Sequence, residues 1–102
     1  MNATQRRHLE VLRRMEGSID GLLFRLPGGF WTVGGVPTAR TTEEGYEVPA
    51  WSVGKVTVMS LERRFWIERL HHHREDWRDP RKLTAEGRAH LKRASRRNPD
   101  TT

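Results

Sequence analysis

The stretch that decides the fold is Thr57–Leu91, TVMSLERRFWIERLHHHREDWRDPRKLTAEGRAHL. Its first residues have an apolar spacing of three, which predicts a helix. Residues 65–70 alternate in polarity as a strand does, 71–80 are polar and turn-like, and 81–83 can return as a second strand. Thr84 is a favourable N-cap for another helix. The stretch therefore predicts a helix, a hairpin and a second helix.

Five short motifs follow one another within it: Thr57-Val58, Leu61-Glu62-Arg63-Arg64, Ile67-Glu68-Arg69, Glu75-Asp76-Trp77-Arg78 and Leu83-Thr84-Ala85-Glu86-Gly87-Arg88. Their order and spacing resemble the recognition helix, wing and following helix of winged helix-turn-helix proteins, MarR-type bacterial regulators in particular. The resemblance covers about a third of the chain. It implies an α+β fold, a small winged-helix-like domain with three helices. One departure is Phe65, which stands where that family usually has a turn glycine.

The N-terminal half predicts one helix followed by a hairpin. Residues 4–16 carry one apolar stripe with arginines on the opposite face, capped by Asn2 or Thr4. Residues 21–36 read as two strands around a Pro-Gly-Gly turn. Residues 37–49 are polar and aperiodic, which predicts a loop, with a short strand at residues 46–48 as the alternative. The hairpin is extra to the family pattern: it lies between the first and second helices, where a regular helix-turn-helix has a short helix.

Length and composition indicate a single small domain. The chain has 102 residues, of which 34% are hydrophobic and 31% charged, so its core is thin. We expect the domain to span residues 1–97 and residues 98–102 to form a disordered tail. The absence of cysteine excludes disulfides and thiolate chemistry and fits a cytoplasmic protein. No apolar run approaches the ~20 residues of a membrane span.

Positive charge is concentrated in the C-terminal half. Residues 1–51 hold six Arg against six Asp and Glu, whereas residues 52–102 hold thirteen Lys and Arg against seven Asp and Glu. The whole excess of +6 therefore lies in the half that resembles a DNA-reading segment. This asymmetry favours a polyanionic partner. The alternative is an arginine-rich solvated surface.

The candidate recognition helix spans residues 52–64, with Ser52 as the expected N-cap. If it enters a major groove, its polar side chains and those of the wing can reach bases or phosphates. The alternative is an amphipathic helix that only closes the core. In the wing, Trp77 is expected to pack under the hairpin, the alternative being an exposed interaction residue, and acidic neighbours compete for the arginines. The candidate DNA-binding residues are Lys55, Thr57, Met59, Ser60, Arg63, Arg64, Arg74 and Arg78.

The sequence offers no catalytic, metal or cofactor site. The run His71–His73 invites a metal interpretation, but consecutive histidines cannot all point one way and no carboxylate has zinc-ligand spacing. We therefore expect no enzyme activity, no metal and no cofactor.

Two functions remain open at this stage. The first is a DNA-binding winged-helix protein, a small bacterial, phage or plasmid transcriptional regulator whose partner is double-stranded DNA. The alternative is a protein–protein interaction module on the same scaffold, an accessory or inhibitor protein of a mobile element. A homodimer and a protein partner are both left open, and a membrane association is not expected.

Overall fold

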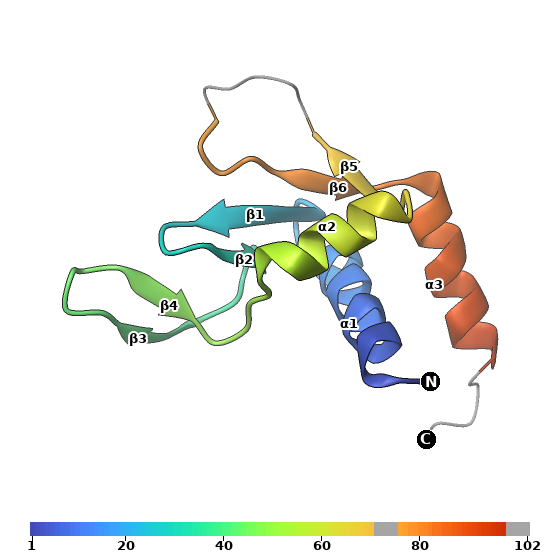
Figure 1. The fold of residues 1–102 in the computed structure, drawn as a ribbon, viewed down its shortest axis with the longest axis horizontal. Coiled ribbons are helices and arrows are strands. Elements are labelled where there is room, and N and C mark those ends of the chain that lie inside the picture. The colour runs from blue at the N-terminus through green and yellow to red at the C-terminus, as the bar shows by residue number, and fades with distance from the viewer. Residues whose placement is uncertain (71–75, 98–102) are drawn as a thin grey trace.

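The computed structural model describes residues 1–70 and 76–97 (Figure 1). The expected tail at 98–102 and the run His71–His73 lie outside the described residues. The elements, in chain order, are α1 (Ala3–Gly17), β1 (Leu22–Leu26), β2 (Phe30–Val33), β3 (Thr38–Thr41), β4 (Glu47–Pro49), α2 (Lys55–Arg63), β5 (Ile67–Arg69), β6 (Arg81–Leu83) and α3 (Ala85–Arg97). The α+β class, with three helices and a small antiparallel sheet in the described part of the chain, is confirmed.

One sheet joins the two halves of the chain. Its strand order is β2-β1-β6-β5, and every pair in it is antiparallel. β1 lies between β2 and β6, so the N-terminal hairpin and the C-terminal hairpin share one surface. The core is formed where α1, α2 and α3 meet this sheet. Its largest fully buried side chains are Leu12, Met15, Leu23, Leu61, Ile67, Val11 and Val58.

The first helix begins with a capping box at Asn2. The Asn2 Oδ1 accepts a hydrogen bond from the Gln5 backbone N–H (2.8 Å), and Gln5 Oε1 accepts one from the Asn2 N–H (2.9 Å). These two bonds satisfy donors that a helix end leaves unpaired. Of the two caps proposed from the sequence, Asn2 is therefore the one used.

Residues 37–49 do not form the predicted loop but the β3–β4 hairpin, and the alternative of a short strand at residues 46–48 overlaps β4. In Figure 1 the hairpin projects away from the four-stranded sheet. Its turn is closed by Thr42, whose N–H donates to the Tyr46 carbonyl (2.8 Å) and whose hydroxyl accepts from the Tyr46 N–H (3.0 Å). All four residues of β3 are exposed. Since the strand buries neither face, it shows no polarity alternation for a sequence reading to detect.

The second helix begins three residues later than predicted, and Ser52 is not its cap. Val53 is held in an extended bridge to Trp31, with backbone hydrogen bonds of 2.9 Å in both directions. Gly54 is the N-cap and provides no side-chain acceptor. The buried Val53 therefore belongs to the edge of the sheet, and α2 is a helix of nine residues.

Phe65 ends α2 in a left-handed conformation, with φ of 60°. Its N–H donates to the Glu62 carbonyl (3.0 Å), and the Trp66 N–H donates to the Leu61 carbonyl (3.2 Å). These are the two bonds of a Schellman motif, in which glycine usually holds the left-handed position. The departure noted in the sequence is thus a residue with a Cβ at a glycine position. As a result, the strand predicted from residue 65 begins only at Ile67.

We expect Phe65→Gly to raise the free energy of unfolding by about 0.5–1 kcal/mol. The left-handed conformation costs a residue with a Cβ about 1–2 kcal/mol, and glycine removes this cost. Part of the stability gained is offset by the greater conformational entropy of glycine in the unfolded chain. Little packing is lost, because the Phe65 side chain is 68% exposed. Urea denaturation measures the change. Phe65→Ala is the control, since alanine keeps the strain, and a Gly variant less stable than the parent would refute this explanation.

The start of α3 is fixed by two residues of the Leu-Thr-x-x-Gly-Arg motif. The Thr84 hydroxyl accepts a hydrogen bond from the Gly87 N–H (2.9 Å) and donates to the Phe65 carbonyl. Gly87 lies against the Trp66 carbonyl so closely that an added Cβ would overlap its oxygen. The predicted Thr84 cap is therefore confirmed, and the glycine is explained by a close approach of α3 to the turn between α2 and β5.

The described residues contain no short helix before α2, the place where a regular helix-turn-helix has one. The chain instead forms the β1–β2 and β3–β4 hairpins between α1 and α2. Among the described residues, no helix has the length and apolar character needed to cross a membrane.

Candidate functional site

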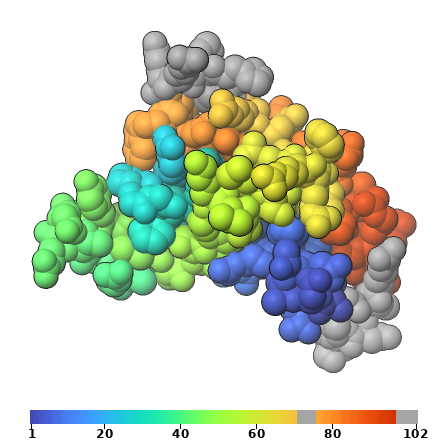
Figure 2. All heavy atoms as spheres, viewed as in Figure 1, coloured from blue at the N-terminus to red at the C-terminus, as the bar shows by residue number. Residues whose placement is uncertain are grey.

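The outer face of α2 is open to solvent. Val58 and Leu61 face the core, while Lys55, Val56 and Met59 are exposed. Arg63, near the C-terminal end of the helix, is exposed as well, and within the described residues it has no ion-pair partner. Figure 2 shows α2 on the surface, between α1 and the segment that carries β5 and β6. The helix is therefore available to a partner rather than enclosed.

A groove of about 500 Å³ runs between α2 and the sheet. Its polar lining carries four cationic and two acidic side chains: Arg25, Lys55, Arg69, Arg81, Glu62 and Asp79. Val58, Met59 and Trp31 supply apolar lining. The groove thus has a net positive charge, and two of the predicted residues, Lys55 and Met59, lie along it.

At the base of the groove lies Arg81, which is only 4% exposed. Its Nη1 is 2.7 Å from the Asp79 Oδ1, and its Nη2 donates to the Asp79 Oδ2 (3.3 Å). Its Nε is 3.5 Å from the Glu62 Oε1, although within the described residues this Nε has no hydrogen-bond partner. The guanidinium carbon also lies 5.2 Å from the centroid of the Trp31 ring. Arg81 therefore connects α2, β2 and the segment before β6.

The charge balance of the groove is set by these pairs. The Arg81 hydrogen bond, assisted by nearby Arg69 and Arg25, holds the pKa of the Asp79 carboxyl below its usual value, against a smaller opposing effect of burial. Asp79 Oδ1 also lies 3.9 Å from the Arg69 Nε. The two carboxylates of the groove, Asp79 and Glu62, therefore pair with Arg81 or Arg69, and neither of them neutralises Lys55 on the α2 side.

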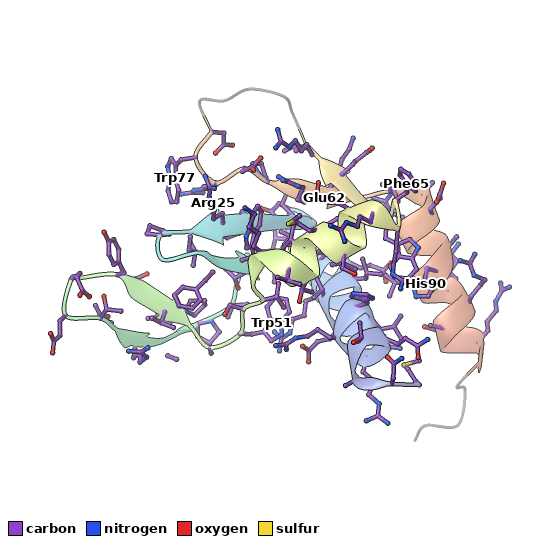
Figure 3. All side chains as sticks on the ribbon, in the orientation of Figure 1. Arg25, Trp51, Glu62, Phe65, Trp77 and His90 are labelled. Atoms are coloured by element: carbon purple, nitrogen blue, oxygen red, sulfur yellow. The ribbon has the colours of Figure 1, made fainter. Side chains whose placement is uncertain are left out.

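The segment before β6 is anchored to the sheet by Arg25. Its Nε and Nη2 both donate to the Trp77 carbonyl, at 3.2 and 2.8 Å (Figure 3). Trp77 is 51% exposed, so the expected packing was wrong and the alternative, an exposed residue, holds. Its main chain is held while its ring is left on the surface. The exposed Arg78 guanidinium lies 5.6 Å from that ring and 5.8 Å from the Phe24 ring.

Arg64 lies apart from the other predicted residues. Its guanidinium is 5.2 Å from the Trp66 ring, whose other neighbours are the stacked His90 ring (3.9 Å between centroids) and the His8 ring, edge-on at 5.9 Å. This cluster of His8, Trp66 and His90 lies where α1 and α3 meet the end of α2, and it lines a separate cavity of about 440 Å³. Arg64 therefore faces the α1–α3 side.

The His8 imidazole gives this cluster a pH dependence. Burial is the main cause that lowers the pKa of His8 below its usual 6.5, and the charges of Arg64 and His90 lower it further. Because the folded pKa is depressed, the unfolded chain binds the proton more readily, and stability that is full above about pH 6.5 is lost as the pH falls below it.

We therefore expect the melting temperature to fall between about pH 7 and pH 5, and to fall less in His8→Phe, which keeps an aromatic ring but cannot be protonated. Thermal denaturation monitored by circular dichroism at both pH values measures the difference. Equal pH dependence in both proteins would contradict the assignment to His8.

The structure places five of the eight predicted residues in two groups on α2. Lys55, Met59 and Arg63 lie on the open side of α2. Thr57 and Ser60 are half-buried and border a hollow against the start of α1. Arg64 faces the aromatic cluster, Arg78 is exposed beside Trp77, and Arg74 lies outside the described residues.

The sequence reading missed Arg25 and Arg69. Arg25 is the one charged residue in the strand Leu-Leu-Phe-Arg-Leu, and that interruption of an apolar run was the available signal. The described residues contain no group of three or more potential ligands for a metal ion, and His71–His73 lie outside them. Comparison with models of protein families, with curated proteins and with solved structures found no match.

Proposed function

We propose that this protein binds double-stranded DNA as a small winged-helix domain and acts as a transcriptional regulator. In this proposal α2 enters the major groove, and the β5–β6 hairpin contacts the flanking backbone. The observation that carries the proposal is the exposed outer face of α2, which has Lys55 at one end and Arg63 at the other.

The size of α2 supports this proposal. An α-helix with its side chains is about 10–12 Å in diameter, so it fits the major groove of B-DNA, which is about 12 Å wide, and the nine residues of α2 give about two and a half turns to lie in it. The helix is held only by its inner face, so its outer face can approach a duplex. The resemblance seen in the sequence also implies a fixed order of elements, a helix, two strands and a helix, and the chain has this order in α2, β5, β6 and α3.

The charge distribution supports a polyanionic partner. The groove beside α2 is bordered by Lys55, Arg25 and Arg69, and Arg78 lies exposed on the segment that Arg25 anchors. The acidic groups that line the groove, Asp79 and Glu62, are paired with the buried Arg81. Cations on such a surface release counterions from DNA when they neutralise phosphates.

Two arginines are expected to have different roles. Arg63 lies on the side of α2 that faces the DNA major groove in this proposal, and there it would contact base edges. We therefore expect Arg63→Ala to reduce the ratio of specific to random-duplex affinity by about tenfold. Arg78 is placed to contact phosphate, so Arg78→Ala should weaken binding to all duplexes alike and reduce the salt slope by about one.

Fluorescence anisotropy with a selected duplex and a random duplex separates these effects. Arg6→Ala is the matched control, because Arg6 is exposed on α1 and lines neither the groove nor the hollow beside α2. Equal losses on both duplexes for both variants would reject this division of roles.

A second candidate function is protein binding by the same scaffold. It is favoured by the exposed Trp77 and Phe65, since large aromatic side chains are common at the centres of protein interfaces. A mobility-shift assay with random duplex DNA at low and moderate salt separates the two candidates. Absence of a shift at low salt would favour protein binding.

A further inference from the structure

The outward stripe of α2 is apolar at its centre. Val56, Met59 and Arg63 lie three and four residues apart and therefore share one side of the helix. The Val56 side chain is 83% exposed and the Met59 side chain 40% exposed. The charged groups lie at the ends of this stripe, at Lys55 and Arg63. A surface that only attracted phosphates would have no need of an aliphatic centre.

Val56 contributes little to the fold. Its side chain is almost fully solvated, and as a β-branched residue it favours a helix less than alanine does. The same branching restricts it in a helix to one strongly preferred rotamer, so its two methyl groups form a rigid apolar surface with little entropy left to lose. These properties suit contact with a small, fixed apolar group on a partner.

We propose that Val56, with Met59 beside it, contacts the C5-methyl groups of thymine in the major groove, so that this protein prefers duplexes with thymine opposite the centre of α2. The inference rests on the proposed function, DNA binding by α2. Thymine carries the one apolar group that the bases display in the major groove, and it is read by apolar side chains. On either side of such a contact, Lys55 matches a phosphate and Arg63 matches a neighbouring base edge.

The test removes one methyl group at a time. The tightest-binding duplex is selected from a random-sequence pool, and each dT in it is replaced in turn by dU, which lacks the C5-methyl group but keeps the same hydrogen-bonding groups and charge. We expect a threefold to fivefold loss of affinity, roughly the value of one buried methyl group, at one or two adjacent positions. At the remaining positions the substitution should have no effect.

Two variants assign the effect to a residue. Val56→Ser should bind the dT duplex more weakly by about the same factor and show no further loss with dU. Ile19→Ser is the matched control, because Ile19 is also an exposed branched aliphatic residue but lies between α1 and β1. It should discriminate dT from dU as the parent does, and circular dichroism should show that both variants are folded.

Three results would overturn the inference. These are selected duplexes without a favoured thymine, equal affinity for dT and dU at every position, and dU discrimination that persists in Val56→Ser. In each of these cases DNA binding itself stands, and the apolar stripe then faces something else, such as a protein. Failure to bind any duplex at low salt would instead remove the proposed function and this inference together.

Discussion

Gly87→Ala is expected to lower the free energy of unfolding by about 3 kcal/mol, although alanine is the better helix former by about 1 kcal/mol. The reason is the approach of α3 to the turn between α2 and β5: a Cβ at this position would overlap the Trp66 carbonyl oxygen. Backbone atoms cannot move aside as the end of a flexible side chain can. The helix start would have to shift, which would disturb the Thr84 cap and its bond to the Phe65 carbonyl.

Thermal and urea denaturation measure this loss, which corresponds to a melting temperature lower by roughly 12–24 °C. Gly17→Ala is the matched control. Gly17 is the last residue of α1, and an added Cβ would meet no atom within 4 Å, so the substitution should be neutral or slightly stabilising. A Gly87→Ala protein as stable as the parent would show that the close approach is not required.

Arg81→Met is expected to cost about 2–3 kcal/mol of stability. Methionine is of similar length, but it leaves the Asp79 and Glu62 carboxylates without the cation that pairs with both. The estimate is at the low end for a broken buried pair because both carboxylates are partly exposed and can regain water. The loss should be accompanied by weaker DNA binding, since Arg81 also links α2 to the segment that leads into β6.

The triple variant Glu62→Gln/Asp79→Asn/Arg81→Met separates charge from packing. If the cost comes from unpaired carboxylates, neutralising them should restore at least half of the lost stability. If the triple variant is no more stable than Arg81→Met, the cost comes from the lost contact of Arg81 with Trp31 and its surroundings instead. Urea denaturation of the parent and the two variants provides the comparison.

Sequence reasoning predicted the elements that bury one side and missed those that do not. The stripe of α1 and the cap at Thr84 were found because periodicity and capping chemistry are local signals. In the β3–β4 hairpin, β4 was considered only as an alternative and β3 was missed, because β3 is exposed on both faces. The start of α2 was misplaced because Val53 pairs with the distant Trp31, which no local pattern reveals.

The candidate site was predicted in part for the same reason. Helical spacing is sufficient to place Lys55, Met59 and Arg63 on the outer side of α2. It does not reveal that Arg64 turns toward the Trp66 ring, because that contact depends on how the end of α2 meets α1 and α3. The burial of Arg81 likewise depends on the register of β6 against β1.

The central claim is that a duplex binds to the cationic surface around α2, and the salt dependence of that binding tests it most directly. Affinity for a random duplex should be measured between about 50 and 200 mM salt for the parent and for Lys55→Ala/Arg78→Ala, which removes two cations expected to contact phosphate. With three to five phosphates neutralised, the logarithm of the affinity should fall against the logarithm of the salt concentration with a slope of about −3 to −5, and the variant should show a slope shallower by about two. No binding at the lowest salt, or the same slope in parent and variant, would contradict the claim.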